Sequence, residues 1–307
     1  MDRKKIVMFG SFVADLTGVA EHLPKAGETV FGESFKIGPG GKGSNQTVAA
    51  HRAGADIKLI TKLGDDLFGK VALDFYKENG ISTDYLIVDE KEDTGIALIC
   101  VDKQVGQNQI LVVPAACTTF NDADMERIKP LIEGADYLLL QFEVNMDALE
   151  KAIDIAKAAG VKIVLNPAPA RKVPQELLAK TDIVTPNEIE AETLTGVPVP
   201  DEAGAKKAAE VLHSWGISDV IITMGSSGVF ASDGKNSRMV PAYKVDAIDT
   251  TGAGDAFNGG FVTALAEGKD IFEASEFGNA LASLSVQKFG TAPSMPQRAE
   301  IDERFGR

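Results

Sequence analysis

Residues 249–255 (DTTGAGD) combine small residues with one acid, at a spacing that could support phosphoryl transfer. Gly252, Ala253 and Gly254 have no side chain larger than a methyl group, so their backbone N–H groups could converge on one point. The apolar residues from Phe257 onward recur at helical spacing, which predicts a loop that enters a helix. The start of such a helix favours a bound anion, because its first amides lack partners and its dipole is positive there.

Asp255 would lie in the first turn of this helix, beside the anion. A carboxylate repels phosphate, so Asp255 needs another purpose at this position. We expect it to take the proton from a hydroxyl that attacks the phosphoryl group. The alternative is an acidic first turn that only complements the helix dipole.

Composition narrows the class of protein. The chain has 307 residues and 44% hydrophobic content, enough to bury a large core as one domain or one domain plus a smaller piece. A formal charge of −14 disfavours binding to nucleic acid. The two cysteines, Cys100 and Cys117, are too few for a disulfide framework, which favours a reducing cytoplasm. The apolar runs are too short for a signal peptide or a membrane span, so we expect no membrane partner.

Short apolar runs alternate with amphipathic ones along most of the chain. Strands are predicted at 5–10, 57–62, 137–142, 161–166, 182–185 and 220–224. Helices are predicted at 45–53, 69–79, 146–159, 188–195 and 203–215. The alternation predicts an α/β layer fold with a mostly parallel sheet.

Residues 13–37 and 94–113 break this rhythm, because they carry β-type residues and glycines with no helix between them. They predict a small strand-rich lid inserted into a larger domain made of residues 1–12, 38–93 and 114–307. Such flaps commonly close over substrates and exclude water.

Three glycine-rich segments compete as a nucleotide site. Residues 38–43 match the dinucleotide-binding pattern G-x-G-x-x-G, but the lid segment separates them from the first core strand. Residues 64–71 imitate a P-loop, with Val71 where a magnesium-binding Ser or Thr is needed. Residues 223–228 (TMGSSG) directly follow a strand and would meet 249–255 at the carboxyl edge of the sheet, where open α/β folds bind ligands.

Asn187 and Glu190 also follow a predicted strand, in the segment 186–190 (PNEIE). Asn187 could simply cap the coming helix. Glu190 could instead reach the water around a magnesium ion. The two interpretations stay open at this point.

Several of these segments, taken in order, resemble one family. Residues 40–46 (GGKGSNQ) and 249–255 look like the two signatures of the ribokinase-like (PfkB) sugar kinases, and 186–190 resembles the family's middle motif. The match runs from Gly10 to about Met295. The segment 166–170 (NPAPA) points to the pentose-phosphorylating members.

The resemblance implies a doubly wound α/β domain with a β-sheet lid that often pairs across a homodimer. It implies transfer of the γ-phosphoryl of ATP to the 5-hydroxyl of a pentose. In that case Asp255 is the base, and the amides of Gly252, Ala253 and Gly254 form an anion hole.

The resemblance also assigns binding positions to this chain. The sugar would contact Asp15, Gly41, Lys42, Asn45 and Glu143. The nucleotide would contact Asn187, Thr223, Gly225, Ser226, Gly228, Gly254 and Asn279, of which Asn279 stands where the family often has His. A monovalent cation, usually potassium, would lie near Asp249, Thr251, Ser285, Lys288, Gly290 and Ser294, while magnesium would arrive with ATP.

Val13 departs from the family, because ribose-phosphorylating members carry Asn at this position. Valine offers no hydrogen bond, and a sugar hydroxyl buried against it would cost on the order of 1–3 kcal/mol. Because Asp15 is kept close by, the missing group would be the 2-hydroxyl, which predicts that 2-deoxyribose is preferred or readily accepted. The alternative is that Val13 belongs to the lid core and another side chain reaches the sugar.

Two other functions fit the same scaffold. A non-catalytic sugar-binding regulator could keep the fold, although binding alone needs no base beside an anion hole. A nucleoside or hexose-phosphate kinase is the other alternative, but a phosphorylated sugar would need more cationic residues in the lid than Lys25 and Lys36.

Overall fold

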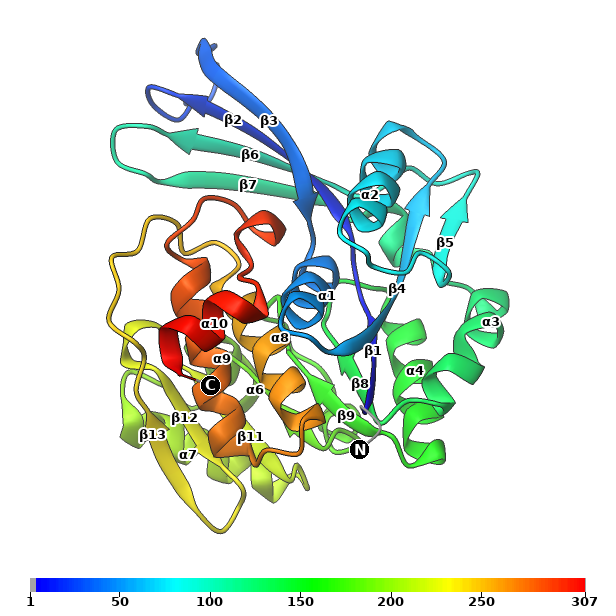
Figure 1. Ribbon diagram of the computed structural model, residues 1–307, viewed down its shortest axis with the longest axis vertical. Helices are drawn as coiled ribbons and strands as arrows, with labels where there is room; N and C mark the ends of the chain where they lie inside the picture. Colours follow the sequence, from blue (N-terminus) through cyan, green and yellow to red (C-terminus); the bar gives the residue numbers. More distant parts are fainter. Residues whose placement is uncertain (1–3, 307) are drawn as a thin grey trace.

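The larger of two sheets organises the molecule. The computed structural model describes residues 4–306, so the predicted domain ends at 1–3 and 307 lie outside the described residues. Nine strands lie in the order β13-β12-β11-β10-β9-β8-β1-β4-β5 (Figure 1). Their bounds are β1 (Lys5–Phe9), β4 (Asp56–Gly64), β5 (Leu86–Asp89), β8 (Tyr137–Leu140), β9 (Lys162–Leu165), β10 (Ile183–Val184), β11 (Asp219–Thr223), β12 (Val229–Ser232) and β13 (Ser237–Val240). Within this order, the seven strands β11, β10, β9, β8, β1, β4 and β5 pair in parallel. Strands β12 and β13 extend the sheet beyond β11 with antiparallel pairing.

Alternation along β1 shows why both faces of this sheet need helices. Ile6 and Met8 belong to one apolar core, and Val7 and Phe9 belong to the other, so the strand is buried on both sides. One face is covered by α1 (Lys42–Arg52), α2 (Leu67–Glu78), α8 (Ala253–Ala266), α9 (Ile271–Ser285) and α10 (Arg298–Phe305). The other is covered by α3 (Asp122–Glu133), α4 (Met146–Ala159), α5 (Gln175–Leu178), α6 (Glu188–Thr195) and α7 (Glu202–Ser214). The predicted doubly wound α/β fold is confirmed.

Short 3₁₀ turns lie at η1 (Ala115–Thr118), η2 (Gly225–Ser227) and η3 (Ala292–Ser294). None of the helices within residues 4–306 is long and apolar enough to cross a bilayer.

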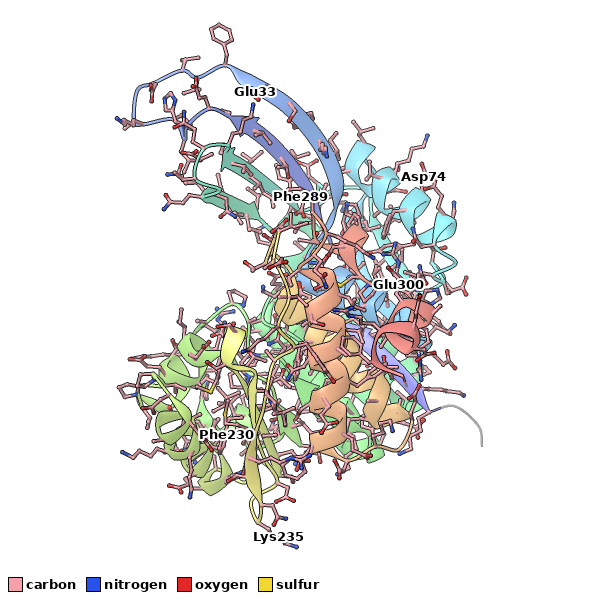
Figure 2. The ribbon with its side chains drawn as sticks, turned by 60° about the vertical axis from the view of Figure 1, so that its left-hand side comes forward. Glu33, Asp74, Phe230, Lys235, Phe289 and Glu300 are labelled. Atoms are coloured by element: carbon pink, nitrogen blue, oxygen red, sulfur yellow. The ribbon has the colours of Figure 1, made fainter. Side chains whose placement is uncertain are left out.

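A second, smaller sheet projects from this body (Figure 1). Its strands are β2 (Val13–Ala20), β3 (Gly32–Gly40), β6 (Ile96–Asp102) and β7 (Asn108–Val113), in the order β3-β2-β6-β7. Figure 2 shows Glu33 on this sheet at one end of the molecule and Lys235, in the turn after β12, at the other. Pairing of β2 with β3 continues to Val13 opposite Gly40, beyond the predicted lid limit at residue 37.

One face of the second sheet carries a row of apolar side chains. Leu16 pairs with Ile37 on one side and Leu98 on the other, and Leu98 pairs with Leu111. Ile37, Leu98 and Leu111 are 43%, 42% and 60% exposed. Asp15 precedes Leu16 and therefore belongs to the opposite face.

Candidate active site

Asp255 lies in the first turn of α8, which begins after Gly252 in the left-handed region at φ 79°. Its side chain is only 7% exposed. Oδ2 accepts a hydrogen bond from Nδ2 of Asn45, and Oδ1 accepts one from Nε2 of Gln46, both at 2.9 Å. No ion pair holds this carboxylate within residues 4–306. It therefore faces neutral donors and stays available to receive a proton.

Burial and neighbouring charge act against each other at this site. Burial raises the pKa of Asp255, while Lys42 and the amides of Gln46 and Asn45 lower it, and the net shift is upward. Burial lowers the pKa of Lys42, but the nearby carboxylates of Asp255, Glu143 and Glu190 together raise it by more. The net shift of this pKa is upward, so the ammonium form is favoured. A protonated lysine thus lies close to an acid whose proton affinity is increased.

The loop before α8 leaves backbone donors free. The N–H of Ala253 donates to the carbonyl of Thr250 at 3.2 Å, so that amide already closes a turn. In the described part of the chain, no acceptor is paired with the amides of Gly252, Gly254 and Asp255. A Cβ placed on Gly254 would meet no atom within 4 Å, which leaves open space at this point. These amides at the positive end of the helix can bind an anion.

The predicted sugar residues gather beside Asp255. Oε2 of Glu143 accepts hydrogen bonds from the hydroxyl of Ser11 and from the amide of Lys42, the latter at 2.9 Å. Gly41 has φ 86°, and a Cβ there would lie 2.8 Å from the amide nitrogen of Val13. Oδ1 of Asn45 is buried and has no partner in the described residues, so it can accept from a ligand hydroxyl.

Asp15 approaches this group from the second sheet. Its Oδ2 accepts from the hydroxyl of Thr291 at 3.1 Å. Burial raises the pKa of Asp15 to about 6, with Glu143 and Asp255 adding to the rise and Thr291 opposing it. Val13 is 5% exposed, and its Cγ1 would be 3.0 Å from a Cβ on Gly95, so it packs at the base of the second sheet.

Four of the predicted nucleotide residues, Asn187, Thr223, Gly225 and Ser226, lie at or after the ends of β10 and β11. Asn187 forms a parallel bridge with Thr223. Asn187 also caps α6, because its side chain accepts from the amide of Glu190 at 2.8 Å while Glu190 accepts from the amide of Asn187 at 2.9 Å. Gly225 and Ser226 are exposed in η2.

Asn279 and Gly228 meet at one carbonyl group. Nδ2 of Asn279 lies 3.2 Å from the carbonyl oxygens of both Val240 and Pro241. A Cβ on Gly228, which has φ 101°, would lie 2.2 Å from the oxygen of Val240. Asn279 therefore anchors the chain after β13, a structural contact that the sequence did not indicate.

The predicted cation residues come together from two loops. The carboxylate of Asp249 accepts from the amide of Thr251 at 2.9 Å and from that of Gly290 at 3.0 Å. Three other side chains bond elsewhere: Ser285 to Ala282, Lys288 to Glu300, and Ser294 to Thr291. Main-chain carbonyls of the two loops could supply further oxygens to a cation here. Among the described residues, no three His, Cys, Asp or Glu side chains gather as metal ligands.

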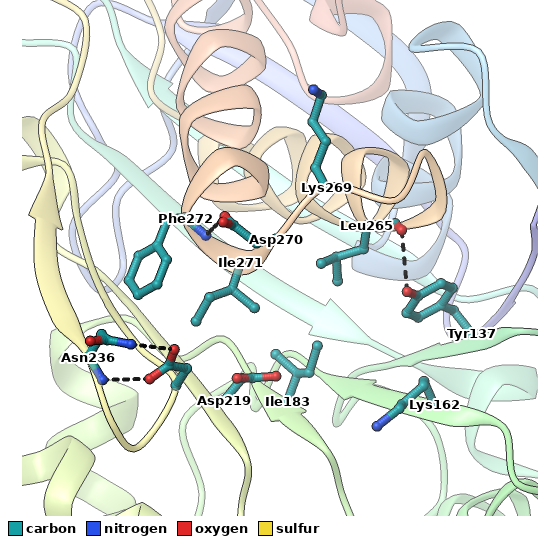
Figure 3. A pocket seen from close by; sticks show the side chains of 11 residues that line it. Tyr137, Lys162, Ile183, Asp219, Asn236, Leu265, Lys269, Asp270, Ile271 and Phe272 are labelled. Atoms are coloured by element: carbon teal, nitrogen blue, oxygen red, sulfur yellow. Dashed lines mark hydrogen bonds between the residues drawn. The ribbon is translucent and has the colours of Figure 1, made fainter.

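A separate cavity of about 430 Å³ lies at the opposite edge of the large sheet (Figure 3). It is lined by the first residues of several strands, among them Tyr137, Lys162 and Asp219. The hydroxyl of Tyr137 donates to the carbonyl of Leu265 at 3.3 Å. None of the predicted catalytic or ligand residues lines this cavity.

The sequence did not assign several residues that the structure places at the site. Gln46, Asn166, Thr185 and Asn258 lie under Asp255 and its loop, and Thr291 contacts Asp15. Gln46 and Asn166 stand inside the segments 40–46 and 166–170, but residue type alone does not show which neighbour an amide will face.

Comparison with known proteins identifies the family of this chain. Residues 3–298 match the model of the pfkB family carbohydrate kinases. The chain belongs to this family. It is accordingly a phosphotransferase with an alcohol group as acceptor.

Relatives in this family carry more specific names. The chain is 45% identical to the ribokinase of Haemophilus influenzae, over 98% of both chains. It is 35% identical to the deoxyribokinase of Salmonella typhi, over 97% of both. The structure of Arabidopsis thaliana ribokinase complexed with ribose and ATP superposes with a TM-score of 0.89 at 32% identity, covering 99% of this chain and 98% of that one.

Proposed function

We propose that this chain transfers the γ-phosphoryl of ATP to the 5-hydroxyl of a pentose, either ribose or 2-deoxyribose. The observation that carries the proposal is the buried carboxylate of Asp255 beside the unpaired amides that open α8. A ribokinase and a deoxyribokinase among the relatives support a pentose as substrate.

The chain's own groups supply a base and an anion site. Asp255 takes the proton of the 5-hydroxyl as that oxygen attacks the γ-phosphorus. The amides of Gly252 and Gly254, with Ala253 once its turn bond to Thr250 is given up, stabilise the charge on the transferred group. The ammonium of Lys42 adds a positive charge close to the reacting oxygens.

ATP would lie along the strand ends that carry Asn187, Thr223 and the turn before β12. Magnesium bound to its phosphates would neutralise their charge. Glu190 fits a water-mediated contact with that ion, because it is 6% exposed and only one of its carboxylate oxygens takes part in the cap. A potassium ion would be held by the carbonyl groups of the two loops that Asp249 joins.

The sugar would lie between Asp15, Lys42, Asn45 and Glu143. We propose that 2-deoxyribose is accepted, because Val13 offers no hydrogen-bonding group at the base of the second sheet. The tight packing of Val13 against Gly95 supports the competing explanation, in which valine is a core residue and the sugar meets other side chains.

We also propose that residues 13–37 and 94–113 act as a lid and as a homodimer contact. A second copy of the same sheet is the occupant that the apolar row of Ile37, Leu98 and Leu111 suits, since such a row is costly to leave in water. Leu98→Lys with Leu111→Lys should give a monomer in sedimentation experiments. A dimer that survives both changes would exclude this surface.

The deciding experiment measures sugar-stimulated release of ADP from ATP. Ribose, 2-deoxyribose, other pentoses, hexoses, hexose phosphates and nucleosides are compared, each with and without potassium. Turnover on a pentose is the expected result. Turnover confined to nucleosides or to another sugar would redefine the substrate, and no turnover on any acceptor would indicate a binding protein.

A further inference from the structure

A series of buried, hydrogen-bonded side-chain amides leads to Asp255. We call this series, which consists of Gln46, Asn166 and Gln141, the amide relay. Nε2 of Gln46 donates to Oδ1 of Asp255 at 2.9 Å and to Oδ1 of Asn166 at 3.0 Å. Nδ2 of Asn166 donates in turn to the carbonyl oxygen of Thr185 at 2.9 Å. On the other side, Oε1 of Gln46 accepts from Nε2 of Gln141 at 3.0 Å. These residues come from α1 and from the ends of β8, β9 and β10.

The carbonyl oxygen of Thr185 fixes the direction of the hydrogen bonds that lead from it to Asp255 in this relay. A backbone carbonyl can only accept, so the carbonyl of Thr185 requires the amide nitrogen of Asn166. The oxygen of Asn166 must then face Gln46, which requires the amide nitrogen of Gln46 on that side. Both hydrogens of this nitrogen are used, one by Asn166 and one by Asp255. The order of donors therefore presents an N–H to the carboxylate.

Thr185 links the same support to the anion loop. Its hydroxyl donates to Oδ1 of Asn258 at 2.6 Å, and Nδ2 of Asn258 donates to the carbonyl of Gly254 at 2.8 Å. Thr185 and Gln46 are 1% and 0% exposed, so neither can touch a sugar directly. One threonine thus holds both the acid and the loop beside it.

We propose that Gln46 is a positioning residue for Asp255, and that Asn166 acts through Gln46 by fixing the direction of its amide. This inference rests on the proposed role of Asp255 as the base. The relay holds the carboxylate at the orientation in which one oxygen faces the incoming hydroxyl, and it stabilises the ionised form that a base requires.

Kinetics can separate positioning from substrate binding. Gln46→Met keeps the length of the side chain and removes its donors, so kcat should fall about 10- to 100-fold while KM for the sugar changes less than about threefold. Thr47→Val is the matched control. It removes one buried hydrogen bond in the same helix, from Thr47 to the carbonyl of Gly43, without touching Asp255. Its kcat should stay within about twofold of the unaltered chain.

The pH profile supplies a readout that a purely structural role would not move. Lys42 on α1, Glu143 after β8, Glu190 on α6 and Asp15 on β2 are the charged groups that face Asp255 and stay in place. Loss of the donor from Gln46 should raise the pKa of Asp255, so the acid limb of kcat should move to higher pH. The control should leave that limb where it is.

A double variant tests whether Asn166 acts through Gln46. Asn166→Leu alone should lower kcat, but added to Gln46→Met it should cost less than about twofold more, because the amide that it directs is gone. If the double variant instead loses kcat by the product of the two single losses, the relay is refuted. Should Gln46→Met not fold, Asn166→Leu with its pH profile tests the same claim.

Asp255→Ala is measured alongside. If that variant retains kcat, the base assignment fails. If Asp255→Ala is inactive while Gln46→Met keeps both its kcat and its acid limb, the base stands and the positioning role is refuted. A fall in thermal stability without either kinetic change also refutes it.

Discussion

The hydroxyl of Thr291 donates to Oδ2 of Asp15 at 3.1 Å, joining residues that are 276 positions apart in the chain. The same hydroxyl lies 3.1 Å from the carbonyl of Pro39, at the end of β3. Gly290, next to Thr291, donates its amide to Asp249. A short path of bonds therefore leads from the proposed sugar residue on the second sheet to the proposed cation loops.

Replacing Asp249 should loosen these loops. Asp249→Ala removes the acceptor shared by Thr251 and Gly290, so the potassium concentration for half-maximal activation should rise about tenfold or more. Asp246→Ala changes an exposed acid in the same segment and serves as the control. Titration of kcat with potassium chloride measures the effect. An unchanged potassium requirement in Asp249→Ala would argue against a cation at these loops.

Removing the base should abolish turnover without emptying the sugar site. Asp255→Ala should lower kcat by about 10³-fold or more, because general-base catalysis and alignment are lost together. Sugar affinity, measured by calorimetry, should change little. Asp65→Ala is an exposed control. A nearly normal kcat in the Asp255 variant would leave phosphoryl transfer without the assigned base.

The side chain at 13 should set the preference between the two pentoses. Val13→Asn adds a donor and an acceptor near Asp15, so the ratio of kcat/KM for ribose over 2-deoxyribose should rise about five- to tenfold. Val19→Asn, farther along the same strand, should leave the ratio unchanged. In the unaltered chain, a preference for ribose of about tenfold or more would contradict acceptance of 2-deoxyribose.

Asp219, in the cavity of Figure 3, predicts a stability effect separate from activity. Burial raises the pKa of Asp219 to about 6, while Lys162 opposes the rise and Asp233 adds to it. The folded state then binds more protons than the unfolded state between about pH 4 and 6, so the free energy of unfolding falls as pH rises through that range.

Asp219→Asn should remove this fall in the free energy of unfolding with rising pH. Because the carboxylate is only partly buried and solvent screens it, the gain in unfolding free energy at pH 7.5 should be about 1 kcal/mol, with none near pH 3.5. Urea unfolding at the two pH values measures this, and kcat should not change. Asp74→Asn, at an exposed site on α2, is the control. An equal gain at both pH values would contradict the titration as its cause.

The elements that carry the site were largely predictable from the sequence. The predicted helices at 146–159 and 188–195 coincide with α4 and α6. The strand predicted at 5–10 is β1, which is one residue shorter. It was predictable because continuous apolar residues mark a strand that is buried on both faces. The helix predicted to carry Asp255 in its first turn is α8.

Other elements gave weaker signals. Helix α9 has ten buried residues among small and apolar types, so it lacks the polar stripe that marks an amphipathic helix. Helix α3 contains Pro130, and the two antiparallel strands β12 and β13 have four residues each. The amide relay under Asp255 was not predictable, because it joins residues far apart in sequence whose partners only the fold selects.

The segment that follows β1 and the start of α1 pack with almost no clearance. A Cβ on Gly43 would lie 2.6 Å from the amide nitrogen of Ser11, and one on Gly10 would lie 2.9 Å from Cα of Gly43. With no room to slide or tilt there, the first turns of α1 are mounted rigidly on the large sheet. Hinge motion of β2 and β3 would thus carry Asp15 toward or away from a stationary platform, on which Asn45, Gln46 and Asp255 keep their mutual alignment throughout.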